Sequence, residues 1–177
     1  MSSPVQACLA APAIRPEAAT DGEAIARVTQ AAFDASEYGN HGEHLIVAAL
    51  REAGALTVSL VAEFEQEIVG HVAISPVSIS DQSANWYGLG PLSVAPDRQR
   101  QGVGAALTLA ALEALRQTGG AGCVVLGDPD YYGRFGFVAD AALTLDGVPP
   151  QYFQALRLSD ARAAGEVRYH PAFAASG

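Results

Sequence analysis

The stretch GLGPLSVAPDRQRQGVG (residues 88–104) decides how the rest of the chain is interpreted. An apolar run at 89–94 ends at Ala95-Pro96-Asp97, and the basic, amide-rich turn 98–101 follows it. Gly102-Val103-Gly104 then leads into a long segment of alanine and leucine that is typical of a helix. The first N–H groups of a helix have no intrahelical acceptor, and the helix dipole favours an anion there. The stretch therefore predicts a strand, a glycine turn and a helix start that bind a phosphate-bearing ligand.

Composition predicts one compact globular unit. The chain has 177 residues, of which 50% are hydrophobic and 16% charged, and this balance excludes a disordered protein. We expect a single domain at residues 13–177, preceded by a flexible N-terminal extension at residues 1–12 that is rich in small residues and interrupted by proline. The net charge of −9 argues against a nucleic-acid partner and favours cationic small molecules or basic peptides.

The cysteines and the apolar runs bear on the compartment. Cys8 and Cys123 lie far apart in unlike surroundings, so we expect both to be reduced and the protein to be cytoplasmic. The mildly apolar segment 5–13 is preceded by no positive charge, because the first basic residue is Arg15. No apolar run approaches the length that crosses a bilayer, so we expect no membrane partner.

Hydrophobic periodicity predicts an α/β (mixed α+β) fold in which helices pack on a mixed sheet. Two β-branched runs separated by Glu65-Gln66 indicate an antiparallel hairpin. We expect strands at 13–15, 56–64, 67–80, 86–94 and 122–126, helices at 23–33, 43–53, 103–118 and 130–135, and extended chain at 136–138. The C-terminal part beyond Pro149-Pro150 is aromatic and less periodic, so we predict no strand boundaries there.

Three nucleotide-binding patterns compete for the glycine turn. A Walker A loop needs Gly-x-x-x-x-Gly-Lys-Ser/Thr, and the chain contains no such string. A dinucleotide fingerprint needs a third glycine and a parallel βαβ unit, whereas Leu107 stands in the third position and the preceding strands look antiparallel. The third pattern, Gln/Arg-x-x-Gly-x-Gly/Ala, is matched by QRQGVG at 99–104. A glycine-rich connection without a ligand is the remaining alternative.

A second motif lies about thirty residues downstream. The segment GDPDYYGRFGF (residues 127–137) places an aromatic pair before a Gly-Phe dipeptide at the end of a predicted strand. With both motifs, the sequence resembles the GNAT superfamily of acyl-CoA-dependent N-acyltransferases over about residues 14–138. The resemblance implies a GNAT-like fold: a mostly antiparallel central sheet, flanked by helices, whose fourth and fifth strands splay apart.

The resemblance also implies acetyl-CoA as cosubstrate and assigns the residues that hold it. Main-chain groups of Leu92, Ser93 and Val94 would pair with the pantetheine arm, and a backbone N–H there would polarise the thioester carbonyl. The phosphates would lie on the turn and the helix start, at Gln99, Arg100, Gln101, Gly102, Val103, Gly104 and Ala105.

The resemblance makes Tyr132 the general acid that protonates the CoA thiolate, a role that suits a phenol with an ordinary pKa near about 10. Tyr131 is expected to face elsewhere as a packing residue. His71 is the second catalytic candidate, a base acting through water, although a lone histidine in an apolar strand is more often structural. Cys123 lies in an apolar strand without an activating cation, which disfavours an acyl-cysteine intermediate. His41 and His44 lack further ligands that we can place, so no metal is assigned.

These observations predict an N-acetyltransferase. It would transfer an acetyl or other acyl group from acetyl-CoA to a primary amine of a small molecule or peptide, by direct attack in a ternary complex. The alternative is a non-catalytic module of the same fold that binds or senses acyl-CoA. The sequence does not choose between a polyamine, an aminoglycoside-like compound, an amino acid and a peptide amine. Many family members dimerise, so a homodimer is a candidate assembly.

Overall fold

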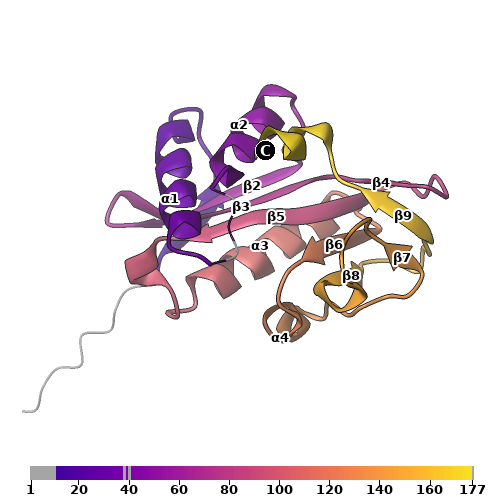
Figure 1. Cartoon of the computed structure of the whole chain (residues 1–177). Helices are drawn as coiled ribbons and strands as arrows, with labels where there is room; N and C mark the ends of the chain where they lie inside the picture. The colour runs from indigo at the N-terminus through magenta and orange to yellow at the C-terminus, as the bar shows by residue number, and fades with distance from the viewer. Residues whose placement is uncertain (1–10, 38, 40, 177) are drawn as a thin grey trace, which may run out of the picture.

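The computed structural model describes residues 11–37, 39 and 41–176 of the chain. The prediction for Cys8 therefore concerns a residue outside the described part of the chain, and so does nearly all of the prediction for the N-terminal extension. The described chain forms a central sheet with helices on both faces, as Figure 1 shows.

Six strands form the central sheet in the order β1-β2-β3-β5-β6-β8. Neighbouring strands pair antiparallel except β5 and β6, which are parallel. The predicted mixed, mostly antiparallel sheet is confirmed. The strands are β1 (Ala13–Pro16), β2 (Val58–Phe64), β3 (Glu67–Pro76), β5 (Trp86–Val94), β6 (Gly122–Leu126) and β8 (Phe153–Arg157).

Helices cover the two faces of this sheet (Figure 1). One face carries α1 (Gly22–Asp34) and α2 (Glu43–Glu52), and the C-terminal 3-10 turn η4 (Pro171–Ser176) lies against α2. The other face carries α3 (Val103–Gln117) and the short α4 (Pro129–Tyr132), which continues into the 3-10 turn η2 (Gly133–Phe135). Two further 3-10 turns are η1 (Pro96–Arg98) and η3 (Pro150–Tyr152).

The core lies mainly between α3 and the sheet. The apolar side chains of Leu107, Ala111 and Leu115 recur every four residues and are fully buried, so one face of α3 packs on β2 and β3. Each fully buried leucine of this kind contributes roughly 1.5–3 kcal/mol to folding. This packing holds the start of α3 at the end of β5.

The two central parallel strands separate after four paired residues. Trp86–Leu89 of β5 pair with Gly122–Val125 of β6, and beyond that point the described chain offers β5 a partner on the β3 side alone. Gly90, which has a φ of 135°, marks the point of separation, since this conformation favours glycine. The predicted splay between the fourth and fifth strands of the sheet is confirmed.

The prediction of a single strand over residues 67–80 is wrong. Strand β3 ends at Pro76, which has no N–H to continue the ladder, and the chain restarts as β4 (Ser78–Ile79). Strand β4 leaves the central sheet and joins β9 (Gly165–Arg168) and β7 (Leu143–Thr144) in a second, three-stranded sheet. The predicted extended chain at 136–138 contributes an isolated bridge between Val138 and Ala155.

Gly122→Ala tests the packing at the parallel pair. An added Cβ would lie 2.5 Å from Cη2 of the buried Trp86 ring, so the ring or the strand must shift. We expect the free energy of unfolding to fall by about 1–3 kcal/mol in urea denaturation, the usual cost of overpacking. Gly133→Ala is the control, because Gly133 has a φ of −57° and no atom lies within 4 Å of its added Cβ. Equal stability of the two variants would contradict this packing.

Candidate active site

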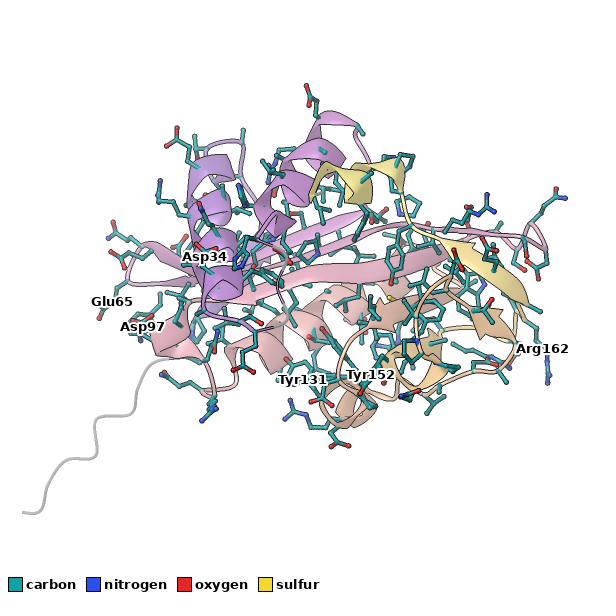
Figure 2. The ribbon with its side chains drawn as sticks, in the orientation of Figure 1. Asp34, Glu65, Asp97, Tyr131, Tyr152 and Arg162 are labelled. Carbon is teal, nitrogen blue, oxygen red and sulfur yellow. The ribbon has the colours of Figure 1, made fainter. Side chains whose placement is uncertain are left out.

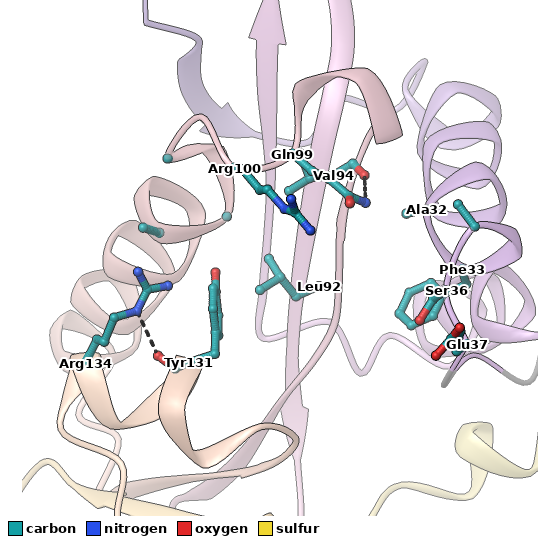
Figure 3. Close-up of a pocket in the computed structure, with 14 residues that line it drawn as sticks. Ala32, Phe33, Ser36, Glu37, Leu92, Val94, Gln99, Arg100, Tyr131 and Arg134 are labelled. Carbon is teal, nitrogen blue, oxygen red and sulfur yellow. Dashed lines mark hydrogen bonds between the residues drawn. The ribbon is translucent and has the colours of Figure 1, made fainter.

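A cavity of about 690 Å³ lies where β5 and β6 separate (Figure 3). It is bounded by the C-terminal half of β5, the start of α3, the α4 segment, and the end of α1 with the loop after it. Its lining residues are Ala32, Phe33, Ala35, Ser36, Glu37, Leu92, Val94, Gln99, Arg100, Gly102, Gly104, Ala105, Tyr131 and Arg134.

The start of α3 presents uncapped N–H groups to this cavity. Gly102 is the N-cap with a left-handed φ of 84°, and no side chain of the described residues caps the helix. The first bond of the helical ladder runs from the Ala106 N–H to the Gly102 carbonyl. The N–H groups of Val103, Gly104 and Ala105 therefore lie ahead of the ladder, where the helix dipole favours an anion.

Two arginines add positive charge to the same cavity. Arg100 enters it from the turn before α3, and Arg134 lies across from it (Figure 3). The guanidinium of Arg134 stacks 4.5 Å from the centre of the Tyr131 ring, and its Nε donates to the Tyr131 carbonyl at 3.2 Å. Arg98 instead stacks over the Phe64 ring at 4.3 Å and is not among the lining residues. Together with the helix start, the two lining arginines fit a phosphate-bearing ligand.

The end of β5 turns alternate side chains to opposite faces. Leu92 and Val94 line the cavity, whereas Ser93 is buried on the α1 face with its Oγ 3.0 Å from Thr29 Oγ1. The Gln99 side-chain amide donates to the Val94 carbonyl at 3.2 Å and closes the turn (Figure 3).

The structure brings together seven of the ten predicted cofactor-binding residues. The seven that line the cavity are Leu92, Val94, Gln99, Arg100, Gly102, Gly104 and Ala105. The side chain of Ser93 faces away, that of Val103 is buried in the core, and the Gln101 amide donates to the Asp97 carbonyl at 3.0 Å. The roles predicted for all ten remain predictions, and several of those roles are main-chain ones that side-chain direction does not affect.

The two adjacent tyrosines take different positions. Tyr131 lines the cavity, and a Cβ added to Gly104 would lie 2.7 Å from its hydroxyl oxygen, so the prediction that it faces elsewhere is wrong. Tyr132 does not line the cavity. Its ring packs edge-on against Phe137 at 5.9 Å between centroids, and burial raises its pKa above the ordinary value. The role of Tyr132 as general acid remains a prediction.

His71 lies outside the cavity, fully buried on β3. Ser59 Oγ donates to Glu17 at 2.6 Å, so the contact of 2.8 Å between Ser59 Oγ and His71 Nε2 requires Nε2 to carry the proton. Arg51 holds Glu17 with two bonds of 2.8 and 2.9 Å. Burial lowers the pKa of His71 to about 4. These contacts favour a structural role, and the predicted role as a base acting through water remains untested.

The remaining candidates are accounted for by their surroundings. Burial raises the pKa of Cys123, which keeps this fully buried thiol neutral. His41 contacts Asp34 at 3.0 Å. Within residues 11–37, 39 and 41–176, no three His, Cys, Asp or Glu side chains are grouped in a way that would hold a metal ion. In the same part of the chain, every helix is too short or too polar to cross a membrane.

Sequence reasoning missed the end of α1, although the GNAT resemblance led us to expect that the loop at 34–42 borders the acceptor pocket. Phe33, Ser36 and Glu37 line the cavity at the end of α1 and in the loop that follows. In the sequence they belong to an ordinary amphipathic helix and a polar loop. Phe33 gave no signal of its own, whereas Ser36 and Glu37 fall in the loop that the sequence assigns to the acceptor pocket.

Comparison with known proteins agrees with this geometry. Residues 23–137 match the acetyltransferase (GNAT) family. The chain is 35% identical to an uncharacterized N-acetyltransferase, YhbS, of Escherichia coli K12 over 167 residues, covering 90% of this chain and 97% of YhbS. The chain therefore belongs to the GNAT acetyltransferase family, which confirms the predicted enzyme class, an acyl-CoA-dependent N-acyltransferase with acetyl-CoA as cosubstrate.

Two crystal structures of similar proteins share the fold. A GNAT family acetyltransferase from Brucella melitensis, in complex with acetyl-CoA, is 46% identical with a TM-score of 0.81, over 91% of this chain and 97% of that one. YhbS from Escherichia coli, in complex with CoA, is 34% identical with a TM-score of 0.84, over 93% of this chain and 92% of that one. The predicted GNAT-like fold is confirmed.

The low pKa of His71 predicts how stability changes with pH. Because this pKa is about 4 in the folded chain and about 6.5 when unfolded, the unfolded state binds the proton first as the pH falls. We expect the free energy of unfolding to fall by roughly 2–3 kcal/mol between pH 7 and pH 4.5 in urea denaturation. In His71→Gln this slope should be largely lost. An unchanged slope in the variant would contradict a neutral, buried His71.

Proposed function

We propose that the protein N-acetylates a primary amine of a small molecule or peptide, by direct attack of the amine in a ternary complex with acetyl-CoA. One observation carries this proposal: a single cavity combines an uncapped helix start and two arginines with the unpaired edge of a strand. The first two features suit the phosphates of CoA, and the third suits its amide-containing arm. Two relatives with the same fold were crystallised with acetyl-CoA and CoA.

The division of labour within the cavity follows from these features. The N–H groups of Gly102 to Ala105, with Arg100 and Arg134, would bind the pyrophosphate. The main chain of residues 92–94 would pair with the pantetheine arm on the side of β5 that β6 leaves free. When bound, acetyl-CoA supplies a thioester whose acyl group is transferred to the amine.

The chemistry needs an uncharged amine and a proton for the leaving thiolate. In our proposal the amine nitrogen forms a bond to the acyl carbon, and the C–S bond breaks with its electron pair on sulfur. Tyr132 gives its proton to that sulfur, and the proton lost by the nitrogen passes through water back to Tyr132. The buried, neutral Cys123 disfavours an acyl-cysteine intermediate.

The acceptor would enter beside the α1 end of the cavity. The exposed carboxylate of Glu37 lies there together with Ser36, and the chain carries a net charge of −9. Both features favour a cationic amine, because a negative field raises the local concentration of such a substrate.

We also propose that residues 13–177 form one acyltransferase domain, since β8 joins the central sheet and η4 packs on α2. We propose in addition that the protein is cytoplasmic.

Two measurements separate this proposal from a module that binds acyl-CoA without turnover. Calorimetry should show micromolar binding of acetyl-CoA and CoA, and no binding at millimolar CoA would refute the assignment of the cavity. Thiol release from acetyl-CoA should then appear with at least one amine in a panel of polyamines, aminoglycosides, amino acids and lysine peptides. Binding without thiol release across that panel would favour the sensing module.

Tyr132→Phe tests the proton donor. Because the variant lacks the acidic hydroxyl, we expect turnover to fall about a hundredfold with little change in acetyl-CoA affinity, measured by thiol release and calorimetry. Tyr152→Phe is the control, since Tyr152 is 46% exposed on η3 (Figure 2). Tyr131→Phe is compared in parallel, because Tyr131 lines the cavity. A larger loss in Tyr131→Phe than in Tyr132→Phe would transfer the role to Tyr131.

Gly104→Val tests the phosphate site. Gly104 lies in the first turn of α3 against the Tyr131 hydroxyl, so a branched side chain there fills the space above the free N–H groups. We expect the affinity for CoA to fall at least about a hundredfold in calorimetry, a loss of about 2.7 kcal/mol. Glu113→Val places the same residue on the exposed face of α3 and should bind normally. Retained affinity in Gly104→Val would place the phosphates elsewhere.

A further inference from the structure

Tyr169 lies between β9 and η4 and carries a hydroxyl that the proposed mechanism does not use. Tyr169 is half-buried as a whole, and its hydroxyl oxygen is buried and has no hydrogen-bond partner among the described residues. The ring is held by Phe173, 4.8 Å away between centroids, and by Gly88 of β5. A Cβ on Gly88 would lie 3.0 Å from Cδ1 of Tyr169 and closer still to Cε1, so this position must be glycine for the ring to fit.

Gly88 lies two residues before the point at which β5 leaves β6. It pairs with Ser75 of β3 on one side and with Val124 of β6 on the other. Neighbouring side chains of a strand point to opposite faces, and Leu89 packs in the cluster under α3. The ring of Tyr169 therefore covers the opposite face of the sheet, the face that carries α2 and η4 (Figure 1).

A second hydroxyl without a partner lies beside Gly88. Ser75, its partner on β3, is fully buried, and no described residue accepts from or donates to its Oγ. Leaving a buried hydroxyl unpaired costs roughly 1–3 kcal/mol. Two such groups around one residue indicate a place where a polar ligand completes the hydrogen bonds.

Tyr132 lies near the same point of the sheet on the other face. It packs in the cluster under α3, and its ring lies against Gly127, the residue that follows β6. The Tyr169 ring thus lies on β5 and the Tyr132 ring beside the end of β6, on opposite faces of the two strands that separate. The start of α3, where the proposed phosphate site lies, is on the Tyr132 face, which leaves the face of α1, α2 and Tyr169 for the acceptor.

We propose that Tyr169 holds the acceptor amine, its hydroxyl oxygen accepting a hydrogen bond from the attacking nitrogen on the face of the sheet opposite α3. This inference rests on the proposed function and names the acceptor side of the same site. Tyr169 stays neutral throughout and neither gains nor loses a proton. The nitrogen forms the bond to the acyl carbon, the C–S electron pair goes to sulfur with the proton from Tyr132, and the nitrogen's proton passes through water back to Tyr132.

The first experiment needs no knowledge of the acceptor. 3-Fluorotyrosine placed at position 169 reports its surroundings by ¹⁹F NMR. We expect its resonance to shift when acetyl-CoA is added, because the acetyl end reaches the gap, and to stay in place with adenosine 3′,5′-bisphosphate, which fills the nucleotide end alone. Acetyl-CoA that binds in calorimetry without moving the resonance overturns the role of Tyr169. Acetyl-CoA that does not bind overturns the proposed function itself.

The second experiment is kinetic and uses Tyr169→Phe with spermidine and a lysine-containing peptide as amines. We expect kcat/KM for the amine to fall about tenfold to a hundredfold, mainly through a higher KM, while the Kd of acetyl-CoA stays within twofold. Tyr152→Phe should leave all three quantities unchanged. Gly88→Ala, which displaces the Tyr169 ring, should reproduce the loss, and adding Tyr169→Phe to it should cost nothing more. An unchanged kcat/KM in Tyr169→Phe overturns the proposal.

Discussion

The separation of β5 from β6 is the constraint on which the site depends. A backbone edge inside a sheet normally pairs with its neighbour, because unpaired N–H and C=O groups are costly to bury. Here the pairing with β6 ends after Leu89, and residues 92–94 pair with β3 alone within the described chain. The fold can leave this edge open because α3 packs across β2, β3 and β5 and holds the sheet together from one face. A ligand with amide groups can then take the place of the missing strand.

The start of α3 and the interior of the sheet near the cavity differ in charge, and each suits a different chemical group. Cationic groups and helix N–H groups meet at the start of α3, while the chain as a whole is strongly acidic. In the interior of the fold, burial raises the pKa values of Tyr132, Cys123 and Tyr169 and keeps all three uncharged. An uncharged, partly desolvated surrounding of this kind suits a reaction between a thioester and a neutral amine.

The hydrogen-bonded polar residues around His71 stabilise the part of the fold that carries the site. Glu17 follows β1, Ser59 and His71 lie on adjacent strands, and Arg51 extends from α2, so their hydrogen bonds connect three parts of the fold. His71 also lies directly opposite Ser93 on β5, one of the strand residues assigned to the pantetheine arm. The strand that would bind the cosubstrate is thereby supported from the α1 face by a neutral histidine.

The sequence by itself determined the order of the main helices and strands up to β6, apart from β4, together with the glycine turn before α3 and the GNAT resemblance, because these depend on local periodicity and on short motifs. It did not determine which of Tyr131 and Tyr132 lines the cavity, since the two side chains point in different directions from the helix and only the packing of that helix decides which direction faces the cavity. Nor could it show β4 leaving the sheet at Pro76, or Tyr169 covering Gly88 from 81 positions away along the chain. These contacts join segments with no local pattern in common, and only tertiary packing brings them together.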